Sequence, residues 1–214
     1  MIVRKMADTD VRDVSALDRA FSELAPEPIA CCNWAEKFPY TPGVVFRMFH
    51  TGAFLALRFD VAERYTAARV DRDNGEVWTD SCVEFFIAPD RESYYNFETN
   101  CIGRMLLGFK RPGTGELHAA PQTLGAVRRI PTLPAAPFEE REGDNRWSMT
   151  LLIPPRALFG HRIGDWSGLE ARANLYKCGD RLSHPHFLSW RPIESERPDF
   201  HRPEFFDTLK FADR

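Results

Sequence analysis

The sequence predicts an all-β protein with the architecture of a β-sandwich, immunoglobulin-like or jelly-roll-like, made of antiparallel sheets with one or two short helices. Three observations favour this fold. About eight to ten short segments alternate apolar and polar residues. Turn-forming residues separate these segments, and 17 Phe and 5 Trp among 214 residues supply large side chains for the interior. We expect residues 1–214 to form a single domain.

The first clear strands form a hairpin. Residues 44–50 and 53–60 alternate on either side of Thr51 and Gly52, and this alternation places Leu55, Leu57 and Phe59 on one face. The run Asp73-Asn74-Gly75 is a turn signal. It precedes a strand with Val83, Phe85 and Ile87 on one face, which ends at Pro89-Asp90.

The remaining chain continues the pattern. Further strands are predicted at residues 94–100, 105–109, 147–153, 169–176 and 205–211, with a long connection at 110–137 that includes a strand near 126–130. Prolines at the start of residues 154–159 indicate one helical turn. Residues 1–40 are interpreted as an N-terminal arm and the first strands, and apolar residues at roughly helical spacing in 7–24 leave a helix or an extended arm open.

Charge and hydropathy exclude several classes of partner. The formal net charge is −3 and the pI is near 6.1, so no global basic field recruits nucleic acid. The longest apolar runs are too short to span a membrane. Residues 1–10 lack the apolar segment of a secretory signal, which predicts a cytoplasmic protein, exported only if a leader has been removed. The odd number of cysteines, five, favours reduced thiols.

The most informative stretch joins an aromatic ring to a carboxylate. Trp78 precedes Glu84 by six residues, and the next strand carries Glu98 and Asn100 on its polar face. An aromatic ring covers the apolar face of a pyranose, while fixed carboxylates and amides accept and donate hydrogen bonds to its hydroxyls. The polar residues of these strands therefore indicate carbohydrate recognition.

The same stretches carry a resemblance to a known family. Residues 80–87, which begin Asp80-Ser81-Cys82, resemble the family 9 carbohydrate-binding modules, and more closely the stand-alone family 9-like proteins. Residues 94–100 with Gly103, 171–180, 184–193 and 198–206 match as well. The resemblance implies a β-sandwich related to sugar- and haem-binding domains of the DOMON kind. It also implies a non-catalytic protein that binds a sugar or the end of a glycan.

In this family two tryptophans clamp the terminal sugar, beside carboxylate, arginine and amide groups. By resemblance, Trp78 with Glu84 corresponds to the first ring and its carboxylate, Trp190 to the second ring and Arg104 to the arginine. Strand and loop positions add further candidates. The expected sugar-binding residues are Trp78, Glu84, Glu98, Asn100, Arg104, Arg172, Lys177, His186 and Trp190.

Two kinds of metal site are alternatives that the sequence leaves open, although no cofactor is the main expectation. Soft ligands cluster in the C-terminal part, at Cys178, His184, His186 and His201. A structural calcium ion held by loop carboxylates is the second alternative, with Asp71, Asp73 and Asp90 as its ligands.

Three other functions compete with sugar binding. Glu84 and Glu98 on adjacent strands could act as the acid and base of a glycoside hydrolase. A haem-binding domain would take an axial ligand from Met48, Met105 or His186. A protein-interaction module would leave the tryptophan emission unchanged when sugar is added.

Overall fold

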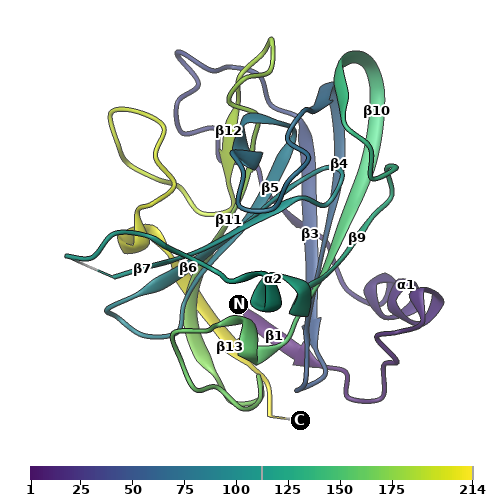
Figure 1. The fold of residues 1–214 in the computed structure, drawn as a ribbon, viewed down its shortest axis with the longest axis vertical. Helices are drawn as coiled ribbons and strands as arrows, with labels where there is room; N and C mark the ends of the chain where they lie inside the picture. The colour runs from purple at the N-terminus through teal and green to yellow at the C-terminus, as the bar shows by residue number, and fades with distance from the viewer. Residues whose placement is uncertain (112, 214) are drawn as a thin grey trace.

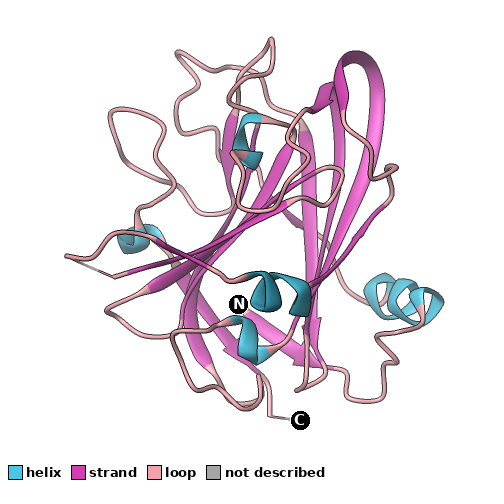
Figure 2. Ribbon diagram, in the orientation of Figure 1, coloured by secondary structure: helices cyan, strands magenta, loops and turns pink. Residues whose placement is uncertain are grey.

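The computed structural model describes residues 1–111 and 113–213, and strands dominate it (Figures 1 and 2). The strands are β1 (Ile2–Lys5), β2 (Glu27–Pro28), β3 (Gly43–His50), β4 (Leu55–Ala68), β5 (Cys82–Ala88), β6 (Tyr94–Asn100), β7 (Met105–Lys110), β8 (Leu117–His118), β9 (Arg128–Pro131), β10 (Phe138–Ile153), β11 (Glu170–Cys178), β12 (Phe187–Ser189) and β13 (Asp207–Phe211). The helices are α1 (Val14–Ser22), α2 (Pro121–Ala126) and the 3₁₀ turns η1 (Val77–Thr79), η2 (Pro155–Ala157) and η3 (Pro203–Phe205).

The strands form one continuous path that folds back on itself into two layers. The order is β8-β7-β6-β5-β11-β13-β1-β3-β4-β10-β9, with β12 beside β11 and β2 beside β3. We call β5, β6, β7, β8, β11, β12 and β13 the front layer, and β2, β3, β4, β9 and β10 the back layer. Strands β5, β6 and β7 cross β3 and β4 at a steep angle (Figure 1). The sandwich prediction is confirmed. The pairing is antiparallel except at β1, which runs parallel to both neighbours.

The main core lies between the layers. Alternation along β5 sends Val83, Phe85 and Ile87 inward, and along β4 it sends Leu55, Leu57 and Phe59 inward; all six are 0% exposed. These were the faces that the sequence predicted.

The outer face of the front layer is also buried, because loops cover it. Cys82, Phe86, Tyr94, Tyr176 and Cys178 form a second cluster there with residues of the C-terminal loop. A strand residue on this face therefore meets the covering loops and not open solvent. The polar side chains on this outer face therefore lie beneath loops. Ligand-binding sites are usually found in such enclosed positions.

Several elements differ from the sequence prediction in extent. Residues 14–22 form α1, capped by the Asp13 carboxylate, which accepts from the backbone N–H of Ser15 at 2.9 Å. Helix α1 buries Leu17 and Phe21 against the back layer. Strand β10 begins nine residues before the predicted strand because it pairs with the long β4.

None of the helices in the described residues has the length and hydropathy that a membrane span would need.

Candidate functional site

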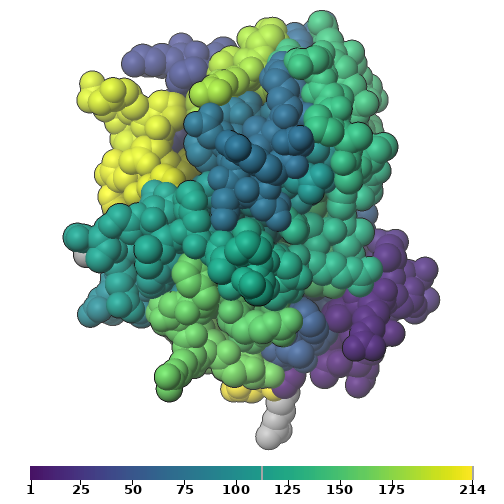
Figure 3. Space-filling view, viewed as in Figure 1, coloured from purple at the N-terminus to yellow at the C-terminus, as the bar shows by residue number. Residues whose placement is uncertain are grey.

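A cavity of about 580 Å³ opens on the outer face of the front layer. Its floor comes from β5, β6, β7 and β11, and its walls come from the segments 72–78 and 198–201. Figure 3 shows the blue segment around residue 75 beside the yellow C-terminal loop on this face. Its lining residues are Arg72, Asn74, Gly75, Glu76, Trp78, Glu84, Glu98, Leu106, Glu116, His118, Cys178, Asp180, Phe187, Pro198, Asp199, Phe200 and His201.

Trp78 lies in η1 on one wall of the cavity and is partly exposed. The turn that carries it is held by the buried carboxylate of Asp80, which accepts from the backbone N–H groups of Arg69 and Val70 at 2.9 Å each. Asn100 completes this support, because its amide donates to Asp80 at 3.0 Å and to the Val70 carbonyl at 2.9 Å. The Trp78 ring is therefore attached to a fixed loop.

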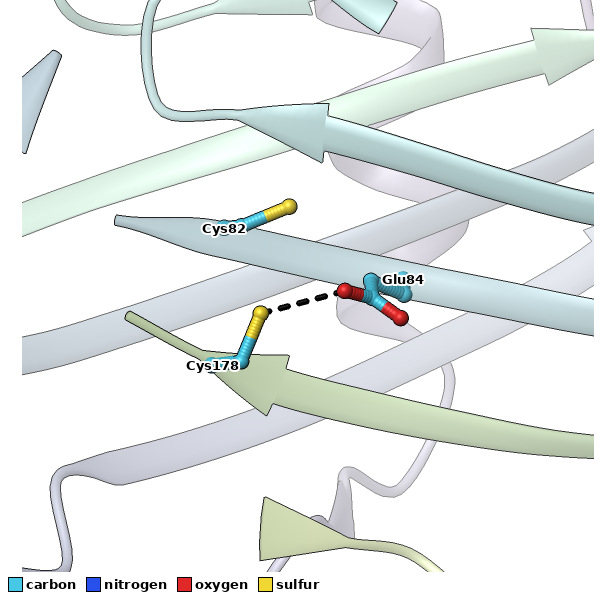
Figure 4. A group of neighbouring side chains, drawn as sticks. All are labelled: Cys82, Glu84 and Cys178. Carbon is cyan, nitrogen blue, oxygen red and sulfur yellow. Dashed lines mark hydrogen bonds between the residues drawn. The ribbon is translucent and has the colours of Figure 1, made fainter. Parts of the chain in front are cut away.

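Glu84 and Glu98 form the acidic floor. They face each other across β5 and β6 and are 3% and 4% exposed. Glu84 accepts a hydrogen bond from the Cys178 thiol at 3.0 Å (Figure 4), and Glu98 accepts one from the Asn96 amide at 2.9 Å. Each carboxyl group has a second oxygen with no hydrogen bond inside the described chain. Those oxygens are available to a ligand in the cavity.

The acidic floor has unusual proton affinity. Burial, together with the facing Glu98, raises the pKa of Glu84 well above its ordinary value. Burial also raises the pKa of Glu98 to about 7 and that of Asp180 to about 6. Near neutral pH a carboxyl group with such a pKa exists in both forms, so it can donate as well as accept a hydrogen bond.

Aromatic residues that were not predicted also line the cavity. Phe187 and Phe200 both line the cavity, and Phe200 stacks on Tyr176 with ring centroids 4.1 Å apart and planes 8° apart. Beside them His201 contacts the Tyr94 hydroxyl at 3.1 Å and the Lys110 ammonium at 3.0 Å. Burial and Lys110 lower the pKa of His201 to about 4, so this imidazole is neutral near pH 7. Phe187, Phe200 and His201 fall in the stretches that carried the family resemblance, which was the available signal.

Three of the expected sugar-binding residues, Asn100, Arg104 and Arg172, are not among the lining residues of the cavity. Asn100 binds the loop that carries Trp78, as described above. Its side-chain oxygen accepts from the backbone N–H of Arg104 at 2.9 Å, and the Arg104 side chain is not among the lining residues. Arg172 lies on the outer face of β11 but donates to the Pro203 carbonyl at 3.0 Å, away from the cavity.

Three expected residues lie on the other side of the front layer, which corrects their placement at the sugar. Lys177 is adjacent to Tyr176 and Cys178 in β11, so its side chain points inward, where it forms an ion pair with Glu63 at 2.9 Å. His186 is 0% exposed and accepts from Lys177 at 2.7 Å. Trp190 packs edge-on against Phe46 in the core.

The proposed soft-metal ligands do not converge. His184 stacks on Tyr65 with ring centroids 4.0 Å apart, His186 faces Lys177, and His201 contacts Tyr94. Within residues 1–111 and 113–213, one group of three or more His, Cys, Asp or Glu side chains brings its ligand atoms within 4.8 Å of one another, and it consists of Cys82, Glu84 and Cys178.

The residues proposed as calcium and haem ligands also have other contacts. Of the proposed calcium ligands, Asp73 accepts from Arg129 at 2.6 Å and Asp90 contacts His161 at 2.8 Å, so each already has a cationic or polar partner. The haem-ligand candidates Met48 and Met105 are both packed in the main core.

Comparison with known proteins agrees with the geometry. The sequence profile described as carbohydrate-binding family 9 matches residues 14–211. A crystal structure of a candidate carbohydrate-binding protein from Bacteroides uniformis ATCC 8492 is 41% identical, with a TM-score of 0.94 over 99% of this chain and 98% of that chain. None of the curated protein sequences matches this chain.

More distant structures share the fold. A family 9 carbohydrate-binding module from Caldicellulosiruptor kristjanssonii, in complex with glucose, is 11% identical with a TM-score of 0.61, covering 100% of this chain and 96% of that chain. The module from that organism in complex with cellotriose gives 11% identity and a TM-score of 0.60, covering 100% of this chain and 94% of that chain. With the profile matched over almost its whole length, this chain belongs to carbohydrate-binding family 9.

Proposed function

We propose that the protein binds a glucose-type sugar, or the end of a glucan chain, in the cavity of the front layer, without chemical conversion. The observation that carries this proposal is the partly exposed Trp78 ring on the wall above the buried Glu84 and Glu98. The ring offers its face to the C–H groups of a pyranose, and the two free carboxyl oxygens offer hydrogen bonds to its hydroxyls. Family membership and the glucose and cellotriose bound by the distant modules guide the choice of sugar.

Phe187 and Phe200 take the place expected for a second tryptophan. They line the cavity together with Trp78, whereas Trp190 lies in the core. A phenyl ring provides a smaller stacking face than an indole, so we expect modest affinity in a cavity that stays partly hydrated.

Calorimetric titration of glucose, cellobiose and cellotriose tests the proposal. Removal of the Trp78 ring in Trp78→Ala loses stacking and buried apolar area of about 1–2 kcal/mol, which is roughly a 5- to 30-fold rise in Kd. The matched control is Trp190→Phe, which changes a buried indole outside the cavity and leaves Kd as in the wild type. Absence of binding to all of these sugars, or an unchanged Kd in Trp78→Ala, would contradict the proposal.

A glycoside hydrolase is the second candidate, and one observation favours it. Glu84 and Glu98 are direct partners on adjacent strands, and such side chains have Cβ atoms about 4.5–5.5 Å apart. Retaining glycosidases need carboxyl groups about 5–5.5 Å apart, a separation that side chains at directly paired positions can reach. Incubation with aryl glucosides and cello-oligosaccharides tests for hydrolysis, and we expect no product. Product formation by the wild type that is lost in both Glu84→Gln and Glu98→Gln would establish the hydrolase instead.

A further inference from the structure

Two thiols and a carboxyl group meet on the floor of the cavity. Cys82 and Glu84 come from β5 and Cys178 from β11, and their side chains point toward one another (Figure 4). The ligand atoms of all three lie within 4.8 Å of one another, and the Cys178 sulfur is 3.0 Å from Glu84 Oε1. For zinc with ordinary bond lengths and tetrahedral angles, sulfur and oxygen ligands lie about 3.5 Å apart. The three atoms are therefore close to a ligand arrangement before any metal binds.

The backbone holds this arrangement in place. Residues 82 and 84 share one face of β5 because side chains alternate along a strand. Cys178 is the register partner of Cys82, so it projects from the same face on the neighbouring strand. The β5–β11 ladder extends over seven residue pairs, and both strands continue the front layer. Such positions on rigid strands need little rearrangement when a ligand binds.

The cluster is buried, yet it can be reached from the cavity. Cys82, Glu84 and Cys178 are 0%, 3% and 1% exposed, whereas Glu84 and Cys178 belong to the cavity lining. The two cysteines are free thiols. One side of the cluster therefore faces a space through which an ion can enter.

The charge around the cluster favours a cation. No lysine, arginine or histidine of the described chain forms an ion pair with Glu84, and the nearby Lys177 points to the opposite face, toward Glu63. Glu98 and Asp180 add further carboxyl groups to the same cavity. A buried carboxyl group ionises only when a cation or a metal ion lies beside it, and within the described residues no side chain forms such an ion pair with Glu84.

We propose that Cys82, Glu84 and Cys178 bind one thiolate-preferring divalent cation of the zinc class, with its fourth position open to the cavity. Two sulfur ligands select such an ion over magnesium or calcium, which prefer oxygen. When the ion binds, the two S–H protons and any carboxyl proton leave to solvent, and two metal–sulfur bonds and one metal–oxygen bond form. Asp180, a water or a hydroxyl group in the cavity supplies the fourth ligand. This inference does not rest on sugar binding.

The test uses the full chain without a histidine tag, reduced and freed of metal. Cadmium or cobalt is titrated while the thiolate-to-metal absorption band is recorded, and zinc affinity is measured by competition with a chromogenic chelator. We expect one ion per chain and a rise in melting temperature with zinc. Cys82→Ser and Cys178→Ser should each lose the band and weaken zinc binding at least ~10- to 100-fold, since even outer-shell changes have effects of that size.

The matched control is Cys101→Ser. Cys101 is a buried free thiol outside the cluster, so its variant should bind zinc as the wild type does. Wild-type protein that shows no thiolate band would overturn the proposal without any variant, as would equal zinc binding in Cys82→Ser and Cys178→Ser. A Cys82–Cys178 disulfide that persists in reducing buffer would overturn it as well. Glucose binding is measured on the metal-free protein. A negative result for the metal therefore does not affect the test of the proposed sugar site.

Discussion

The buried ion pair between Lys177 and Glu63 provides a quantitative test of which side of the front layer binds sugar. Both side chains are 0% exposed, and their charged atoms are 2.9 Å apart. Glu63 also accepts from the Trp147 indole at 2.7 Å, and Lys177 also donates to the Cys178 carbonyl at 2.8 Å and to His186 at 2.7 Å. The substitution Lys177→Met keeps an unbranched side chain that is one atom shorter, but it removes the charge and the contacts of Lys177 with Glu63, the Cys178 carbonyl and His186.

The expected cost follows from the loss of one partner of a buried pair. An uncompensated carboxylate in the interior destabilises a protein by about 3–5 kcal/mol. For a chain of this length, each kcal/mol lowers the melting temperature by about 2–4 °C, so the variant should melt about 6–20 °C below the wild type. The double variant Glu63→Gln with Lys177→Met should recover part of this loss, because the buried charge is gone.

Urea unfolding and calorimetry measure these changes, and glucose titration accompanies them. The control is Lys210→Met, which breaks a surface pair with Glu170 whose side chains are 62% and 64% exposed; such pairs contribute about 0–1 kcal/mol. Equal stability losses in Lys177→Met and Lys210→Met would refute the reasoning. So would a Lys177→Met variant with wild-type stability and no sugar binding, which would restore Lys177 to the binding site.

Three more substitutions have defined outcomes. Trp190→Ala should lose about 3–5 kcal/mol of stability, measured by urea unfolding, because it empties a core position, while glucose affinity stays unchanged. At Asp90, burial raises the pKa but hydrogen bonds, that from His161 first among them, lower it to about 2, below the ordinary 3.8. Its stabilising effect is thus present above about pH 4 and lost toward pH 2, and thermal melts of Asp90→Asn and wild type should converge over that interval. Gly52→Ala should lower stability by about 1–2 kcal/mol in the same melts, since φ is +88° and the new Cβ would lie 2.6 Å from the Asp165 carboxylate.

Strand positions were the most predictable part of the molecule, because a period of two fixes which side chains share a face. That period placed Glu84 and Glu98 together on the outer face, and the cavity contains both. It also argues against Lys177, which follows Tyr176 by one residue and so points inward with Glu63. Lys177 was expected at the sugar because it lies in a stretch that resembles the family. Its position in the alternation of the strand points it away from that face.

Loop aromatics could not be assigned in this way. Trp78 and Trp190 both lie next to strands of the front layer, yet one lines the cavity and the other packs against Phe46. The difference arises from long-range contacts: Asp80 and Asn100 hold the turn of Trp78 outward, whereas the backbone N–H of Trp190 donates to Leu175. The Cys82–Glu84–Cys178 cluster was missed for a related reason, since β5 and β11 are neighbours in space but 80 or more residues apart in sequence.

Strand β1 has a consequence for the order of assembly. It joins the two layers, with Ile2 beside Lys210 of β13 and Arg4 beside Phe49 of β3. The first residues of the chain thus remain without one neighbour until β13 has been synthesised. Closing a loop of more than 200 residues is slow. We therefore expect the two layers to form first and the pairing of β1 with β13 to form last. Deleting residues 1–5 would accordingly expose the facing edges of β13 and β3, which β1 now joins into one continuous path, and would favour pairing between chains.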